Sequence, residues 1–188
     1  GDECARAGTE AGQRHRVKIL VSDTSVLIDH DRAGLIKRTF SLPYEFVVPD
    51  LLFQKELRTW SDLDLRSFGL RVEELTSDEV HAAVRLKRDR DELSTIDTFA
   101  YCLAKGRGWV LLTGDGELRR LAERTRLQTY GALWVFDEFE RCGVCSVDVL
   151  HVGLTAIREH PRCRLPMRET NARLRRWAGE SSITKNSG

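Results

Sequence analysis

Residues 109–113 are the sequence feature that most constrains the fold. They form a continuous apolar run, Trp-Val-Leu-Leu-Thr, between Gly108 and Gly114. A short run of this kind is typical of a parallel strand that is covered on both faces by helices. The segment therefore predicts an α/β fold.

Strand-like runs alternate with helical patterns along much of the chain. We expect further strands at residues 17–21, 46–49, 70–75 (an edge strand) and 133–136. The helices between them are expected to follow Asp23, to run from an N-cap at Asp50 to about Trp60, and to span about 78–88, 95–105 and 117–124. This order predicts a three-layer α/β/α sandwich around a parallel sheet of about five strands.

The domain organisation follows from the same patterns. We expect a flexible polar leader at residues 1–16, an α/β domain at 17–142, a C-terminal helical extension at 143–178 and a disordered tail at 179–188. The extension carries only helical patterns, separated by Gly143 and Pro161.

Composition gives weaker constraints. The chain has 188 residues, of which 41% are hydrophobic, enough for the core of one domain. A formal net charge of +1 neither supports nor excludes a nucleic-acid partner. No apolar run is long enough to cross a bilayer, and the polar N-terminus lacks the apolar stretch of a signal peptide. These observations predict a cytoplasmic protein without a membrane partner.

Five cysteines do not suggest a secreted disulfide framework and fit reduced thiols. Cys142 and Cys145 have the spacing of zinc ligands, and His151 and Cys163 complete a candidate set of four. The alternative is that two ordinary cysteines flank a helix end at Gly143.

Two aspartates follow expected strands at the edge where open parallel sheets bind ligands. Asp23 comes after the first strand and Asp115 after the run at 109–113. Each also suits the N-cap of the helix that follows. Taken together, the two favour a functional site.

Asp97 and Glu56 are the other candidates. Asp97 lies in the first turn of a helix, where the dipole favours an acid, but Ala100 and Ala104 continue its face and predict that it points inward. Glu56 sits about one and a half turns into the helix after the second strand, although a mid-helix Glu is often simply solvated.

Four carboxylates in one pocket repel each other by about 1 kcal/mol per pair at 4 Å in water, and by about 4 at an effective dielectric of 20. Cations would stabilise such a site, and oxygen ligands suit Mg²⁺ or Mn²⁺. Beside a phosphodiester, these ions activate water and stabilise the leaving oxygen. The four residues therefore predict phosphoryl chemistry.

Three segments resemble the PIN-domain ribonucleases: 21–29 (VSDTSVLID), 93–97 (LSTID) followed by Ala100, Leu103 and Ala104, and 111–115 (LLTGD). The resemblance covers about residues 17–136. It implies that Asp23, Glu56, Asp97 and Asp115 are catalytic ligands of one or two Mg²⁺ or Mn²⁺ ions, with hydrogen-bonding support from Thr24, Ser25 and Thr113. RNA is the implied substrate, cut by an endoribonuclease. Glu56 is carried over by location alone.

Many small members of that family are toxins of toxin–antitoxin pairs. The resemblance therefore also implies a homodimer and an antitoxin protein as partner. The helical extension after Phe136 is longer than a minimal toxin needs.

Two other enzyme classes lack their diagnostic residues in this chain. A haloacid-dehalogenase-like phosphatase needs a second Asp where this chain has Ser25, and no glycine-rich loop follows the first strand to cradle a nucleotide. The alternative from another class is a catalytically silent PIN-fold module that binds RNA or acts as a scaffold.

Arginines gather in two places and could contact phosphates or simply form solvated helix faces. They are Arg119, Arg120, Arg124 and Arg126 after Asp115, and Arg162, Arg164, Arg168, Arg173, Arg175 and Arg176 near the C-terminus.

Overall fold

The computed structural model describes residues 17–58 and 64–185, and a five-stranded sheet lies at its centre. The strands are β1 (Lys18–Ser22), β2 (Tyr44–Pro49), β3 (Arg71–Glu73), β4 (Val110–Leu112) and β5 (Thr129–Tyr130). Their order is β3-β2-β1-β4-β5, and every pair is parallel. The predicted parallel sheet is confirmed, with β3 as an edge strand.

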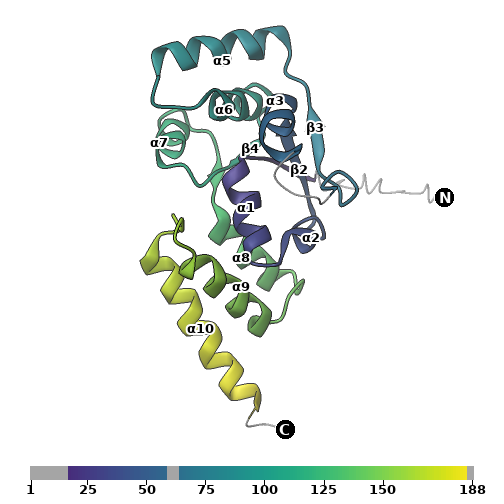
Figure 1. Ribbon diagram of the computed structural model, residues 1–188, viewed down its shortest axis with the longest axis vertical. Coiled ribbons are helices and arrows are strands. Elements are labelled where there is room, and N and C mark those ends of the chain that lie inside the picture. The colour runs from purple at the N-terminus through teal and green to yellow at the C-terminus, as the bar shows by residue number, and fades with distance from the viewer. Residues whose placement is uncertain (1–16, 59–63, 186–188) are drawn as a thin grey trace, which may run out of the picture.

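Helices cover both faces of this sheet (Figure 1). The helices of one face are α1 (Thr24–Arg32), α8 (Ala132–Arg141), α9 (Val147–Glu159) and α10 (Met167–Lys185). Those of the other are α6 (Thr95–Arg107) and α7 (Gly116–Arg124), with α5 (Ser77–Asp89) packed on α6. The result is the expected three-layer α/β/α sandwich.

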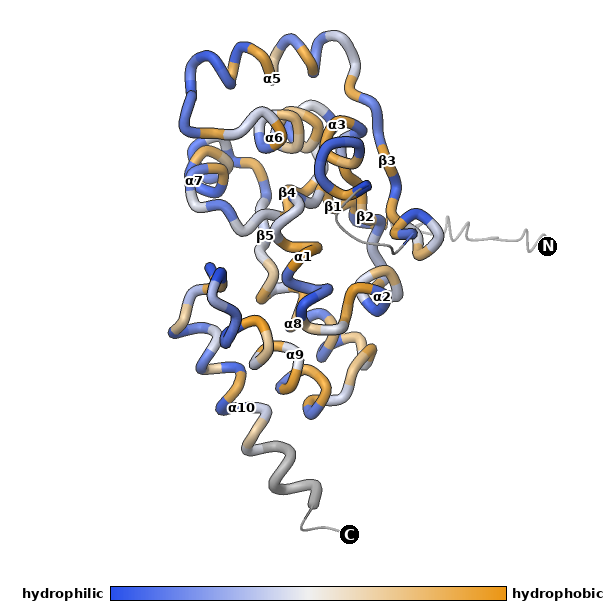
Figure 2. The backbone as a smooth tube through the Cα atoms, in the orientation of Figure 1, coloured by the Kyte–Doolittle hydropathy of each residue, from blue (hydrophilic) through white to orange (hydrophobic). Residues whose placement is uncertain are grey.

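The side chains of the buried strands point alternately to the two faces of the sheet, and each face has its own hydrophobic core. Leu20 of β1 belongs to the core that contains Phe136 of α8 and Trp177 of α10, whereas its neighbour Val21 faces the core that contains Leu103 of α6. Successive side chains of a strand point to opposite faces, so one apolar run serves both layers. In Figure 2 the central strands β1 and β4 are hydrophobic, whereas the outer helix α5 is largely hydrophilic.

The prediction of a strand at residues 133–136 was wrong. These residues belong to α8, and the fifth strand is the two-residue β5 that precedes it. A short apolar run does not by itself distinguish a strand from a buried helix. Here Phe136 packs against His30 of α1 and Trp177 of α10, and these tertiary contacts favour the helix.

The helix after β2 also differs from its prediction. Asp50 is the first residue of α3 (Asp50–Leu52), and Pro49 rather than Asp50 occupies the N-cap. The helix continues as a π-helical turn, η1 (Phe53–Leu57). Its predicted end near Trp60 lies outside the described residues.

The C-terminal helices share a core with the sheet. Leu154 of α9 and Trp177 of α10 are fully buried in the same cluster as Leu20. Helix α10 continues to Lys185 (Figure 1), so residues 179–185 are helical where a disordered tail was expected. The predicted leader at 1–16 and residues 186–188 lie outside the described part of the chain.

A short α2 (Ile36–Thr39) connects α1 to β2. No helix in residues 17–58 and 64–185 combines the length and the apolar character needed to span a bilayer.

Arg107 at the end of α6 connects the edge strand to the helical layer above it. Its guanidinium contacts Glu73 of β3 at 2.8 Å and Glu79 of α5 at 3.0 Å, and it lies over the Trp109 ring. We expect Arg107→Ala to lower the free energy of unfolding by about 1–2 kcal/mol, because two half-buried carboxylates each lose a charged partner, although Glu73 keeps Arg71 and Glu79 keeps the Thr76 N–H. Urea unfolding at neutral pH measures the change. A difference below about 0.3 kcal/mol would show that this network contributes nothing.

Candidate active site

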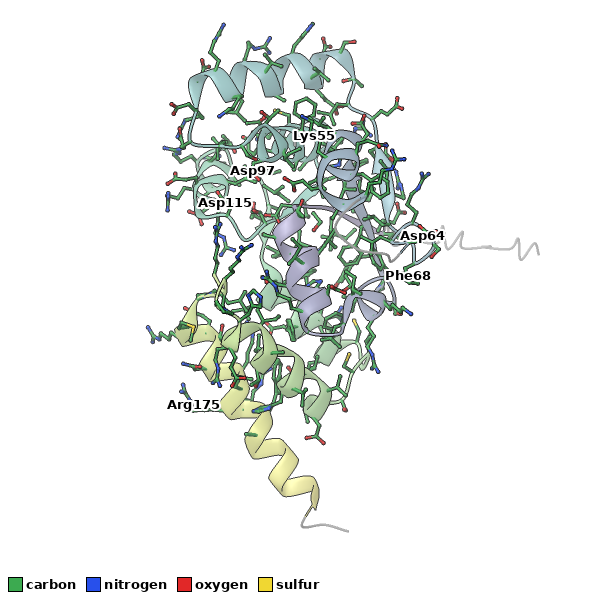
Figure 3. All side chains as sticks on the ribbon, viewed as in Figure 1. Lys55, Asp64, Phe68, Asp97, Asp115 and Arg175 are labelled. Atoms are coloured by element: carbon green, nitrogen blue, oxygen red, sulfur yellow. The ribbon has the colours of Figure 1, made fainter. Side chains whose placement is uncertain are left out.

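A cavity of about 960 Å³ opens at the carboxyl edge of the sheet, where β1 and β4 end. Its lining includes all four predicted acids and two of the predicted hydroxyl residues: Asp23, Thr24, Ser25, Glu56, Asp97 and Asp115. These residues come from segments that are far apart in the sequence. Figure 3 shows Asp97 and Asp115 on neighbouring elements above α1.

Asp23 is the most enclosed of the four, with 4% of its surface exposed. Its Oδ1 accepts hydrogen bonds from the Ser25 hydroxyl (2.8 Å) and the Val26 backbone N–H (3.0 Å). Its Oδ2 accepts from the Thr113 hydroxyl and from the Gly114 N–H (3.0 Å). Burial raises the pKa of this carboxyl, while the four donors act in the opposite direction.

The turn after β4 is built to meet Asp23. Thr113 is fully buried, and its hydroxyl also accepts the Asp115 N–H at 3.0 Å. A Cβ on Gly114 would lie 2.8 Å from the Ser25 hydroxyl oxygen, so a larger residue there would displace the hydroxyl that donates to Asp23. Thr113 therefore acts from beneath the cavity and is not part of its lining.

Asp115 and Asp97 both occupy helix N-termini. Asp115 is the N-cap of α7 and accepts the Leu118 N–H at 2.8 Å. Asp97 forms a capping box with Ser94, whose backbone N–H (3.2 Å) and hydroxyl (2.7 Å) reach its Oδ2. Both are half-buried at the cavity wall. Asp97 and Asp115 therefore each cap a helix and line the cavity at the same time.

Glu56 reaches the cavity from the π-helical turn η1 and accepts a hydrogen bond from the Thr24 hydroxyl. π-helical turns often occur at functional sites. The sequence predicted Glu56 from its place in an ordinary helix, whereas the turn that carries it is π-helical.

The donor set suits Mg²⁺ or Mn²⁺ by its chemistry, since all candidate ligands are oxygens and one carboxylate is buried. As oriented, however, no group of three or more His, Cys, Asp or Glu in the described residues could hold a metal ion. The capping bonds explain this, because they turn Asp97 and Asp115 toward their own helices. In the described part of the chain, Oδ1 of Asp97, Oδ2 of Asp115 and Oε1 of Glu56 nevertheless accept no hydrogen bond.

Sequence reasoning missed the aromatic residues of the cavity. Tyr130 and Trp134 line it and stack with ring centroids 4.0 Å apart. The helical spacing of buried residues over 132–139 would have placed Trp134 on a helix, but a strand was expected there.

Within the described residues, the predicted zinc ligands Cys142, Cys145, His151 and Cys163 do not form a group that could hold a metal ion. Cys102, Cys142, Cys145 and Cys163 are free thiols. Gly143 has φ +65° directly after α8, which agrees with two cysteines flanking a helix end.

The fold and this cavity define an α/β protein with acidic residues gathered at the carboxyl edge of a parallel sheet. A family model, DUF3368, described as a PIN domain, matches residues 19–179. The chain belongs to this PIN-domain family, and PIN domains are typically metal-dependent nucleases. The match includes α8, α9 and α10 as far as residue 179.

Among solved structures, the chain is similar to a PilT N-terminus domain protein, SSO1118, from the hyperthermophilic archaeon Sulfolobus solfataricus P2. The identity is 12%, the TM-score is 0.40, and the alignment covers 62% of this chain and 89% of that one. No curated protein matches the chain.

Proposed function

We propose that this protein is a Mg²⁺- or Mn²⁺-dependent endoribonuclease whose ligands are Asp23, Glu56, Asp97 and Asp115. One observation carries the proposal: the four carboxylates, from four separate segments of a PIN-domain chain, line a single cavity at the carboxyl edge of its sheet. Mutually repelling groups gathered in this way indicate a cation-dependent function.

Each residue has a defined part in this proposal. Asp23, fixed by four hydrogen bonds, is the rigid ligand, and Thr113 and Gly114 hold its orientation. Asp97, Asp115 and Glu56 supply the remaining carboxylate oxygens, and Thr24 holds Glu56. A bound ion would supply activated water and neutralise charge on the phosphoryl oxygens.

A cleavage assay tests the proposal directly. Single-stranded and structured RNAs are incubated with the full chain in Mg²⁺, in Mn²⁺ and in EDTA. We expect cleavage with either ion and none in EDTA. Cleavage that persists in EDTA would contradict the proposed mechanism.

Metal binding should also stabilise the protein in the absence of RNA. An ion at 100 times its dissociation constant adds about 2.7 kcal/mol to the free energy of unfolding. We expect Mn²⁺ to raise the melting temperature of the wild type and EDTA to reverse the shift, as measured by differential scanning fluorimetry. An equal shift in the Asp23→Ser, Asp115→Asn double variant would place the ion elsewhere on the protein.

A specific observation favours the second candidate, a silent RNA-binding or scaffolding module. The described carboxylates serve as helix caps and form no ready coordination shell. This module would bind RNA equally in Mg²⁺ and in EDTA and would cleave none. The cleavage assay and the melting assay together therefore distinguish the two functions.

The toxin role, the homodimer and the antitoxin partner stay predictions from the resemblance. Growth arrest on induced expression, relieved by Asp115→Asn, would support a toxin, and sedimentation would test the dimer. Free thiols at the four described cysteines support a cytoplasmic location, where the environment is reducing.

A further inference from the structure

The wall of the cavity formed by the C-terminal helices carries three arginines, Arg162, Arg164 and Arg173, and one acid, Glu169. The connection between α9 and α10 contributes Arg162, Arg164, Leu165 and Pro166 to the lining. This connection is a hydrophilic stretch at the start of α10 (Figure 2). The cavity is therefore bounded on one side by carboxylates and on another by guanidinium groups.

The backbone of this connection is held in place. The Cys163 N–H donates to the His160 carbonyl at 2.9 Å, and the fully buried Thr170 donates its hydroxyl to the Pro166 carbonyl at 2.9 Å. Leu165 packs against the main core. The two arginines thus extend from an anchored segment.

Their charges are available to a ligand. Arg173 and Arg176 of α10 are occupied by ion pairs with Asp137 and Glu140 of α8. Within the described residues, Arg162 and Arg164 have no ion pair, although the same cavity contains several carboxylates. Arg119, the third lining arginine without an ion pair in that part of the chain, donates to the Thr113 carbonyl at 3.1 Å.

We propose that Arg162 and Arg164 bind backbone phosphates of single-stranded RNA beside the bond that faces the carboxylates. This inference rests on the proposed function and adds a second binding element to it, supplied by the C-terminal helices. Guanidinium groups match the geometry of phosphate oxygens. The burial of Asp23 at the carboxyl edge favours a flexible strand, because a rigid duplex backbone cannot reach the buried carboxylate.

The same helices provide a matched control. Arg168 and Arg175 lie on α10, are exposed and are absent from the lining of the cavity. Figure 3 shows Arg175 directed away from the body of the protein. The Arg162→Ala, Arg164→Ala pair and the Arg168→Ala, Arg175→Ala pair remove the same charge from neighbouring positions.

The test measures binding of a short fluorescein-labelled single-stranded RNA over a range of salt concentrations. All proteins carry Asp115→Asn so that cleavage is slow during the measurement. Two lost phosphate contacts should reduce the slope of log affinity against log salt by about 1.4. We expect this smaller slope for the Arg162→Ala, Arg164→Ala variant. The Arg168→Ala, Arg175→Ala control should keep the slope of the parent protein. Arg162→Lys with Arg164→Lys should keep the slope, because the charge remains.

Equal slopes for the two alanine pairs would overturn the inference. Equal competition by an unlabelled RNA duplex would overturn its single-strand part. In proteins that retain Asp115, the double substitution Arg162→Ala, Arg164→Ala should raise KM for RNA and leave kcat nearly unchanged. If the wild type cleaves no RNA but the slope changes as expected, the proposed nuclease function fails and the phosphate contacts stand.

Discussion

Asp115→Asn is expected to reduce kcat/KM for RNA cleavage by on the order of 10³, about 4 kcal/mol of transition-state stabilisation. The substitution separates the two roles of this residue. Asn caps a helix as well as Asp does, so the bond to the Leu118 N–H and the stability of α7 should be retained. Only the negative charge and one ligand oxygen are lost. Steady-state cleavage in Mn²⁺, with urea unfolding in parallel, measures both.

Asp78→Asn is the control for this experiment. Asp78 is an exposed acid in the first turn of α5 and does not line the cavity. We expect it to leave cleavage unchanged. If Asp115→Asn also cleaves at the wild-type rate, Asp115 is a cap alone and the four-carboxylate site is wrong.

Acid is expected to destabilise the protein through His30. This side chain of α1 is fully buried against Phe136 and Phe139, with Nδ1 3.1 Å from the Thr39 hydroxyl. Burial lowers its pKa to about 3, with a smaller opposing effect from the backbone of Ala132. The unfolded chain therefore takes up the proton first as the pH falls.

The contribution of His30 to stability is complete above about pH 6.5 and is lost as the pH falls toward 3. The expected loss is about 2 kcal/mol by pH 5 and about 4–5 kcal/mol by pH 3. His30→Leu should remove this part of the acid sensitivity. Thr39 retains a partner in the variant, because its hydroxyl also donates to the Leu35 carbonyl.

Urea unfolding of both proteins at about pH 7.5 and pH 5 isolates this effect. The raised pKa of Asp23 makes this carboxyl favour folding more strongly as the pH falls, which is opposite to the effect of His30. Asp23 is present in both proteins, so its contribution cancels when their stabilities are compared. Parallel loss of stability in wild type and His30→Leu would show that another group controls the acid response.

Much of the fold could be predicted because the strands are locally distinct. The strands β1, β2 and β4 come from largely apolar runs and end at Ser22, Pro49 and Leu112. Helix ends also carried local signals, such as the Thr76 and Ser94 capping boxes and Gly108 in the left-handed conformation. Such signals depend on a few neighbouring residues, so sequence alone reveals them.

The errors arose where distant contacts decided the outcome. Residues 133–136 are helical because α1 and α10 pack against them. The basic residues show the same limitation. Sequence grouped six C-terminal arginines, whereas the structure separates those paired with α8 from Arg162 and Arg164 at the cavity. Charge pairing across elements has no local pattern.

The acids at the carboxyl edge show how the two sources of information divide. The sequence by itself determined the parallel α/β fold and placed Asp23 and Asp115 after strands, because strand periodicity and turn residues are local properties. Only the tertiary structure decided that Glu56 reaches the same cavity through a π-helical turn and that Arg162 and Arg164 face it from the C-terminal helices. These placements depend on how packed layers meet, and packing joins residues that no local pattern connects.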